Sequence, residues 1–171
     1  MTEKHKERSK MTWLIMDICD MKDFETDSFD LIIDKSTMDA LCCGDDSLLK
    51  IALMLKEQIR VLKTDAHYFC ISYGKPEARL QHFEQVFLSW EIREFILYDS
   101  QIESEEEKNE KCHYIYVCKV NDDANEICEK YFHKAYELLK VDNDIQKEVE
   151  RQYGQEDDSD EDADDGKQRQ E

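Results

Sequence analysis

The sequence predicts an α/β fold. Short apolar runs rich in β-branched and aromatic residues alternate along the chain with longer stretches of helical periodicity. Several of these runs stop at polar residues, as buried strands do where they open onto loops. The 171 residues have 40% hydrophobic content, which supplies a modest core for one domain and an extension.

The elements can be placed in order along the chain. The run 29–33, FDLII, stops at the polar quartet 34–37, DKST, which indicates a strand followed by a polar loop. The fourth and fifth strands are close in sequence, so we expect them to be antiparallel neighbours. The expected strands are 13–16, 29–33, 67–73, 90–98 and 112–120, and the expected helices are 47–62, 77–89 and 122–153.

The last helix and the residues after it form the C-terminal part of the chain. Apolar residues recur at helical spacing over 122–153, and this stripe has to be covered either by the sheet or by another chain. From Gly154 onward we expect disorder, because residues 156–165 hold eight acidic side chains and no basic one.

Charge and composition exclude several classes of protein. The net charge of −19, from 23 basic and 42 acidic residues, disfavours nucleic acid and anionic membranes as partners. Neither a membrane-spanning run of about 20 apolar residues nor the apolar core of a signal peptide is seen, so we expect a soluble cytoplasmic protein. The seven cysteines never form a CxxC pair, which favours buried thiols over a metal site.

One run of the sequence is similar to a known family. Residues 13–42, WLIMDICDMKDFETDSFDLIIDKSTMDALC, resemble class I, seven-strand methyltransferases that use S-adenosyl-L-methionine, and within them the lysine methyltransferases of elongation factor 1-alpha. The resemblance extends over roughly 4–120, and its most specific part is 28–41. It implies strands 3 to 7 of a Rossmann-like methyltransferase sheet with flanking helices. It also implies transfer of a methyl group to a protein lysine, with a translation factor as a candidate substrate.

The resemblance implies roles for four residues. Asp17 matches the position whose carboxylate accepts a hydrogen bond from the adenine amino group, and Ile18 the position whose backbone amide meets the ring. Lys35 matches the loop position that closes over the cofactor, and Asp34 is a candidate catalytic residue that orients the substrate amine. Taken singly, Asp17 could be a turn residue and Lys35 a solvated charge, and Asp39 could pair locally or contact substrate.

The same resemblance implies that part of the fold is missing. The chain begins at the family's third strand, and all four glycines lie downstream, so the glycine-rich first loop is absent. With the family's strand order of 3-2-1-4-5-7-6, strand 13–16 would have no neighbour and strand 29–33 would be a bare edge. Ser36 also replaces a common glycine, which we expect to be tolerated if its φ is negative.

The sequence therefore predicts three parts, a partial methyltransferase domain at 1–121, a helical extension at 122–153 and an acidic tail at 154–171. The chain is expected to be an incomplete gene model or a fragment that needs a complementing N-terminal piece. The alternative is a non-catalytic, methyltransferase-like interaction module, in which the helix at 122–153 and the acidic tail hold a basic partner.

Overall fold

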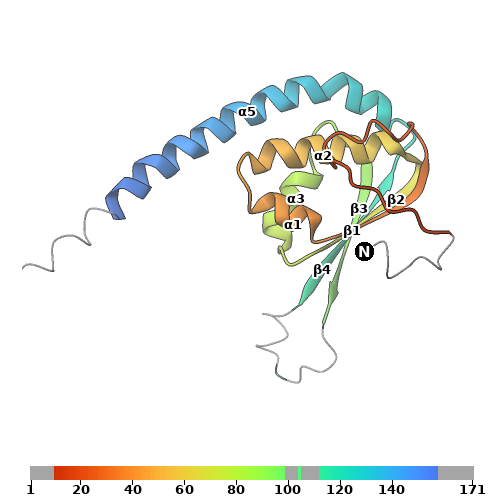
Figure 1. Cartoon of the computed structure of the whole chain (residues 1–171), viewed down its shortest axis with the longest axis horizontal. Coiled ribbons are helices and arrows are strands. Elements are labelled where there is room, and N and C mark those ends of the chain that lie inside the picture. Colours follow the sequence, from red (N-terminus) through yellow and green to blue (C-terminus); the bar gives the residue numbers. More distant parts are fainter. Residues whose placement is uncertain (1–9, 99–103, 105–111, 158–171) are drawn as a thin grey trace, which may run out of the picture.

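The computed structural model describes residues 10–98, 104 and 112–157, in which four strands form one sheet with helices on one of its faces (Figure 1). The α/β fold expected from the sequence is thus confirmed. Residues 158–171, which contain most of the expected acidic tail, lie outside the described part. The elements are β1 (Phe29–Lys35), α1 (Thr37–Cys42), α2 (Ser47–Val61), β2 (Leu62–Ser72), α3 (Pro76–Phe83), β3 (Trp90–Leu97), β4 (His113–Val120) and α5 (Ala124–Asp157).

The strand order of the sheet is β1-β2-β4-β3. β1 pairs with β2 in parallel, and β4 lies between β2 and β3 and is antiparallel to both. This order agrees with the 4-5-7-6 end of the sheet that the resemblance implies, and it confirms the antiparallel pairing of the last two strands. β1 has β2 as its one partner among the described strands, so it is an edge strand, as expected.

The core lies between the sheet and the helices. Met54, Leu55 and Ile59 of α2 are fully buried against the covered face of the sheet, where Tyr68 of β2 and Tyr116 of β4 are also fully buried. The long helix α5 packs across the outside of α2 through its N-terminal half, and its other end extends beyond the body (Figure 1). The resulting order is sheet, then α2, then α5.

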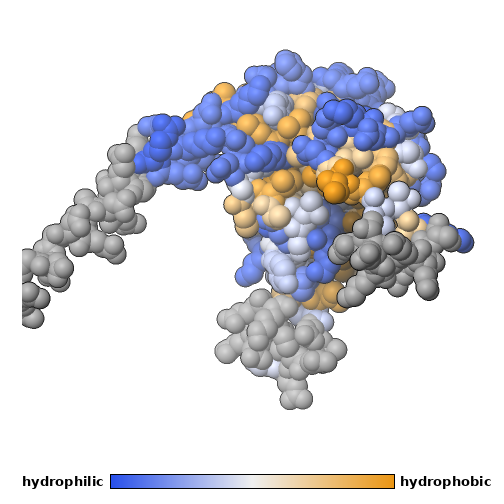
Figure 2. All heavy atoms as spheres, viewed as in Figure 1, coloured by the Kyte–Doolittle hydropathy of each residue, from blue (hydrophilic) through white to orange (hydrophobic). Residues whose placement is uncertain are grey.

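The expected strand at 13–16 is wrong, because these residues form no strand. Leu14 and Ile15 are 58% and 107% exposed, and Figure 2 shows apolar residues at the surface over this N-terminal segment. A strand needs a neighbour to accept its backbone hydrogen bonds, and no described strand lies beside this segment. Local β propensity alone therefore does not decide the conformation.

Several boundaries also differ from the expectation. β2 begins at Leu62 and not at residue 67, and α5 continues to Asp157, beyond residue 153 where the helix was expected to end. The loop expected after β1 contains the short helix α1, whose first amides are held by the Asp34 carboxylate. Helix α3 ends at Phe83 instead of continuing to residue 89, and the indole Nε1 of Trp90 donates a hydrogen bond of 2.8 Å to the Phe83 carbonyl. At α1 and at α3, a side chain satisfies backbone groups at a helix end.

Candidate functional site

The parallel strands β1 and β2 bring their carboxyl ends together at one edge of the sheet, where Lys35 is in register with Ile71. Ligands of open α/β sheets bind at this kind of edge. The loops that follow the two strands carry Ser36 on one side and Tyr73 and Gly74 on the other. The candidate site therefore lies at this edge.

Asp34 is buried at this edge, with 4% of its surface exposed. Its Oδ1 accepts a hydrogen bond of 2.7 Å from the Thr37 amide, and its Oδ2 accepts one of 2.8 Å from the Tyr68 hydroxyl and one of 3.2 Å from the Met38 amide. Burial, with nearby negative charge, raises the pKa of the Tyr68 hydroxyl well above its ordinary value, so it remains a donor. The carboxylate thus fixes the first turn of α1.

Ser36, between β1 and α1, adopts φ 64° and ψ 10°, in the left-handed region that favours glycine. The condition under which serine was expected to be tolerated, a negative φ, is therefore not met. The Oγ atom of Ser36 is also buried without a hydrogen-bond partner. Glycine is common at this position in the resembled family, which is consistent with a left-handed conformation. Serine itself gives no indication of this conformation, so it could not be predicted from the residue type.

Asp39 of α1 joins the two loops through a polar network. Its Oδ1 accepts hydrogen bonds from the Ser72 hydroxyl and from Nη2 of Arg79, the latter at 3.0 Å, and its Oδ2 accepts one of 3.1 Å from the Tyr73 amide. The Ser72 hydroxyl oxygen in turn accepts from Nε of Arg79 and from the Gly74 amide, at 3.0 and 2.9 Å. The Asp39 carboxylate is therefore paired within the protein, with partners that are distant in the sequence.

The network also sets the ionisation of Asp39. Burial by itself raises the pKa of this carboxyl, but the hydrogen bonds from Ser72, Tyr73 and Arg79 outweigh burial and hold the pKa below its ordinary value. Asp39 is thus an anion at neutral pH, and its charge is matched by the guanidinium of Arg79. The loops after β1 and β2 are held as one unit.

Gly74 completes this unit. A Cβ atom at this position would lie 2.3 Å from the guanidinium of Arg79, so any other residue would push this side chain out of the network. The Gly74 carbonyl accepts a hydrogen bond of 2.7 Å from the Tyr116 hydroxyl on β4. Sequence reasoning missed Ser72 and Arg79, although a polar residue at the end of an apolar strand was a signal for Ser72.

Asp17 lies in a turn, and its side chain is exposed. Its Oδ1 accepts a hydrogen bond of 2.9 Å from the Cys19 amide, and the Cys19 thiol donates one of 3.3 Å to the carbonyl of Lys50 in the first turn of α2. Helix α2 starts at the end of the domain where β1 ends, because the Ser28 amide before β1 bonds the last residue of α2. The turn therefore lies at the same end of the domain as the candidate site.

The other two predicted residues differ in exposure. Ile18 is half-buried and packs against the core, so its side chain anchors the turn that carries Asp17. Lys35, the last residue of β1, is exposed at the edge strand. All four predicted residues are thus found at one end of the domain, and Asp34 is the one among them whose carboxylate is enclosed.

These residues fit one half of S-adenosyl-L-methionine. The exposed Asp17 carboxylate and the Ile18 amide suit the amino group and ring nitrogen of adenine. The methionine half needs a close backbone approach, typically from glycines in a tight turn. None of the glycines in the described part has a positive φ, and Gly74 is filled by the Arg79 side chain. The described residues therefore include groups that suit the adenine half of the cofactor, and no glycine turn that would suit the methionine half.

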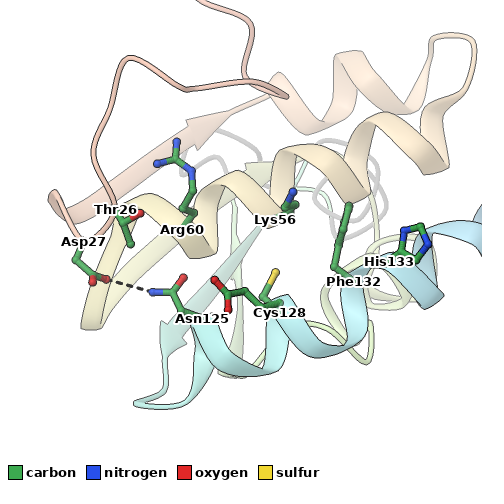
Figure 3. Close-up of a pocket in the computed structure, with 9 residues that line it drawn as sticks. Thr26, Asp27, Lys56, Arg60, Asn125, Cys128, Phe132 and His133 are labelled. Carbon is green, nitrogen blue, oxygen red and sulfur yellow. Dashed lines mark hydrogen bonds between the residues drawn. The ribbon is translucent and has the colours of Figure 1, made fainter.

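A cavity of about 780 Å³ lies elsewhere, between α2, α5 and the loop before β1 (Figure 3). Figure 3 shows Asp27 bonded to Asn125 across its rim, at 3.3 Å. Arg60 on its wall is fully engaged by Glu57 and by the carbonyls of two loop residues. The cavity lies between this loop, α2 and α5, and the predicted site residues lie outside it.

The described residues contain no group of three His, Cys, Asp or Glu side chains arranged to hold a metal ion. In the same part of the chain, every helix is too short or too polar to cross a bilayer.

Comparison with known proteins finds methyltransferases among the proteins that this chain resembles. No family profile matches the chain. EEF1A lysine methyltransferase 4 of Mus musculus and of Bos taurus align over 91 residues, at 25% and 26% identity. The chain resembles the S-adenosyl-L-methionine-dependent methyltransferases of the EEF1A lysine methyltransferase group. The alignment covers 48% of this chain and 35% of each relative, so the chain spans about a third of their length.

Two solved structures align with part of the chain. A SAM-dependent methyltransferase from Methanosarcina mazei superposes with a TM-score of 0.41 and 12% identity, over 62% of this chain and 65% of that chain. A protein from Thermus thermophilus described as a DNA modification methylase gives a TM-score of 0.41 and 14% identity, over 58% of this chain and 48% of that chain.

Proposed function

We propose that the chain forms the adenine side and the acceptor side of an S-adenosyl-L-methionine-dependent methyltransferase that methylates protein lysine, incomplete without further polypeptide. One observation carries this proposal. The most specific part of the resemblance, 28–41, folds as a strand, a left-handed turn and a helix at the carboxyl edge of the sheet, and Asp34 and Asp39 hold it there.

The roles of the residues follow from their surroundings. Asp17 and Ile18 hold the adenine ring, with Asp17 accepting from its amino group. The bound cofactor supplies a methyl group on a positively charged sulfur. Lys35 is exposed and free to close over the cofactor. Asp34 acts as a positioning residue, since its carboxylate is engaged by Tyr68 and α1 and orients the loop that faces the amine.

Charge supports a protein substrate. The net charge of −19 favours encounter with a basic protein surface, on which target lysines are common, and the effect is mainly on the association rate. The names of the relatives mention EEF1A, so the candidate substrate that we propose is a translation factor. The cytoplasm is the location that we propose for the reaction.

A non-catalytic interaction module is the second candidate. The observation that favours it is an apolar stripe along α5 that packs on nothing described. The exposed residues of this stripe are Tyr131, Leu138, Val141, Ile145 and Val149. An interaction module would use this helix and would not require the cofactor.

Titration of the ¹⁵N-labelled chain with S-adenosyl-L-methionine, followed by amide chemical shifts, separates the two candidates. We expect saturable shifts at 17–19 and around Lys35, lost in Asp17→Ala and kept in Asp23→Ala, an exposed aspartate of the same segment. Shifts that persist in Asp17→Ala would mean that the cofactor binds elsewhere, and they contradict the assigned adenine site. The absence of any shift in the wild-type chain contradicts cofactor binding by the adenine side, which the proposal requires of this chain alone, and favours the interaction module.

A further inference from the structure

Helix α5 carries apolar side chains on two of its sides. The inner stripe packs on the core, and its residues are Ala124, Cys128, Phe132, Ala135, Tyr136 and Leu139. The outer stripe is 38% to 60% exposed, and its residues are Tyr131, Leu138, Val141, Ile145 and Val149. A surface helix needs a single apolar stripe to pack on its own domain. The outer stripe is therefore available to a second helix.

The outer stripe has the spacing of a coiled-coil seam. Tyr131, Leu138 and Ile145 are seven positions apart, and Val141 lies three positions after Leu138. A repeat of seven residues with apolar side chains at its first and fourth positions lets two helices interlock their side chains along one line. Four of the five residues lie within 138–149, which is about three turns of helix, so the seam fits a reversible pair of helices.

Most of the outer stripe lies on the part of α5 that projects from the body (Figure 1). Among the described side chains after Leu139, Asn143 and Lys147 reach the body, and both donate hydrogen bonds to Asp46. A helical segment with so few tertiary contacts is marginal in water, because packing of an apolar side supplies most of the stability of a helix. A second helix along the outer stripe supplies that packing and leaves α2 in place.

The charges beside the outer stripe differ between its two ends. Lys134 is exposed near its N-terminal end, whereas Asp142, Asp144 and Glu148 are exposed near its C-terminal end. Two copies of α5 in antiparallel order bring each Lys134 to the acidic end of the other helix, and parallel order brings like charges together. The outer stripe is therefore complementary to itself in antiparallel order.

The overall charge of the chain favours the same order. Two chains of −19 repel one another, but salt at physiological strength screens charges on surfaces that are more than about 8 Å apart. Antiparallel order holds the two bodies at opposite ends of the paired helices, where this repulsion is weak. Parallel order would hold both bodies at the same end.

We infer that the outer stripe binds the outer stripe of a second copy of this chain, so that two α5 helices pair in antiparallel order. In the register that matches the heptad positions, Leu138 of each copy packs against Val141 of the other, and Ile145 packs against the methylene chain of Lys134. The Lys134 ammonium then lies beside Asp144 of the other copy. The pairing uses neither the candidate site nor the cofactor, so it goes beyond the proposed function and does not depend on it.

The test is sedimentation velocity of the full 171-residue chain over a range of concentrations. A reducing agent is present, because Cys43 is exposed and a disulfide would link copies independently of α5. Leu138→Lys on the outer stripe is compared with Val86→Lys in the turn after α3, because the two side chains are 60% and 68% exposed and neither belongs to the core. Circular dichroism shows whether the variants keep their helix content.

We expect a reversible equilibrium between monomer and dimer, with a dimer at least about tenfold weaker in Leu138→Lys and unchanged in Val86→Lys. Lys134→Glu should also weaken the dimer. The double variant of Lys134→Glu with Asp144→Lys should restore it, because the exchanged charges meet again in antiparallel order.

The inference is overturned if the chain is monomeric at every concentration, if Leu138→Lys leaves the dimer unchanged, or if Val86→Lys weakens it equally. A double variant whose dimer stays as weak as that of Lys134→Glu would contradict the antiparallel order. A chain that stays monomeric and instead binds a synthetic amphipathic peptide of lysine and leucine, with affinity lost in Leu138→Lys, would assign the outer stripe to a basic partner and would also overturn the inference.

Discussion

Asp39 and Arg79 form an ion pair at 3.0 Å although they are 40 positions apart in the sequence. Their side chains are 15% and 13% exposed, so water screens the pair only weakly. The pair connects α1, which follows β1, to α3, which follows β2. The carboxyl edge of the sheet therefore depends on this contact for its shape.

Removal of the Asp39 charge is expected to destabilise the fold. Asp39→Asn would leave the Arg79 guanidinium partly buried without an anion and would weaken the hydrogen bonds from Ser72 and Tyr73. We expect a loss of about 2 kcal/mol in the free energy of unfolding, measured by urea denaturation.

The matched control is Glu137→Gln. Glu137 pairs with Lys140 at 2.7 Å on the outside of α5, where the side chains are 51% and 45% exposed. Such surface pairs contribute little to stability, so we expect almost no change in the free energy of unfolding. Equal effects of the two substitutions would show that the Asp39 network is no more than a surface contact.

Ser36→Gly is expected to stabilise the chain by about 1 kcal/mol, because glycine relieves the left-handed conformation and removes a buried hydroxyl without a partner. Ser36→Ala removes the hydroxyl and keeps the strain, so it should give a smaller gain. Thermal unfolding of the wild-type chain, Ser36→Gly and Ser36→Ala measures the order of their stabilities.

Asp46 provides the contrast for this prediction. It has a similar φ of 56°, but its carboxylate accepts hydrogen bonds from Asn143 and Lys147. Asp46→Gly should therefore fail to stabilise, since relief of strain is offset by the lost contacts. Equal stabilisation by Ser36→Gly and Asp46→Gly would mean that the backbone angle alone determines the change in stability.

His82 should make the stability depend on pH. Burial, with the nearby Arg79 charge, lowers the pKa of its imidazole from 6.5 to about 4. In the unfolded chain His82 takes up a proton below pH 6.5, whereas in the folded chain it does so only near pH 4. The neutral imidazole therefore contributes its full stabilisation above pH 6.5, and this contribution is lost as the pH falls from 6.5 to about 4. The expected loss is up to about 3 kcal/mol.

Urea denaturation at several pH values measures this effect, with His82→Gln as the comparison. The variant should show a flatter dependence between about pH 6.5 and about pH 4.5. Asp39 and Glu57 have lowered pKa values, so their contributions are lost only at lower pH, below their ordinary values of 3.8 and 4.5. A variant with an unchanged slope in this window would exclude His82 as the cause.

The secondary-structure elements that depend on local sequence pattern were predicted from the sequence. The elements whose conformation depends on contacts with distant residues were not. The four strands of the sheet and helix α2 follow from periodicity, and their order agrees with the resemblance. The segment 13–16 has the composition of a strand but no neighbour, and α1 depends on a cap from Asp34 that residue type alone does not reveal.

The candidate site shows the same division between local and distant information. The resemblance assigned roles to Asp17, Ile18, Asp34 and Lys35, and the structure places these residues at one end of the domain; their roles stay predictions. The Asp39–Arg79 pair brings together residues from α1 and α3, and no spacing rule in the sequence connects them.

The distal half of α5 is expected to depend on Asn143. This side chain is 5% exposed and donates a hydrogen bond of 2.8 Å to Oδ1 of Asp46, which also accepts one of 2.6 Å from Lys147. Asp46 lies just before α2, so the contact fixes α5 to the body one turn beyond its last apolar packing residue, Leu139.

Asn143→Ala should release this end of the helix. We expect faster hydrogen exchange from Leu138 to Arg151 and unchanged exchange from Ala124 to Tyr136, where apolar packing on α2 holds the helix. Asn125→Ala is the control, because its bond to Asp27 at 3.3 Å lies at the start of α5 and is exposed. Exchange that rises uniformly along α5 in Asn143→Ala would show that the helix detaches as one unit, so that the polar contact stabilises the whole helix and not its distal half alone.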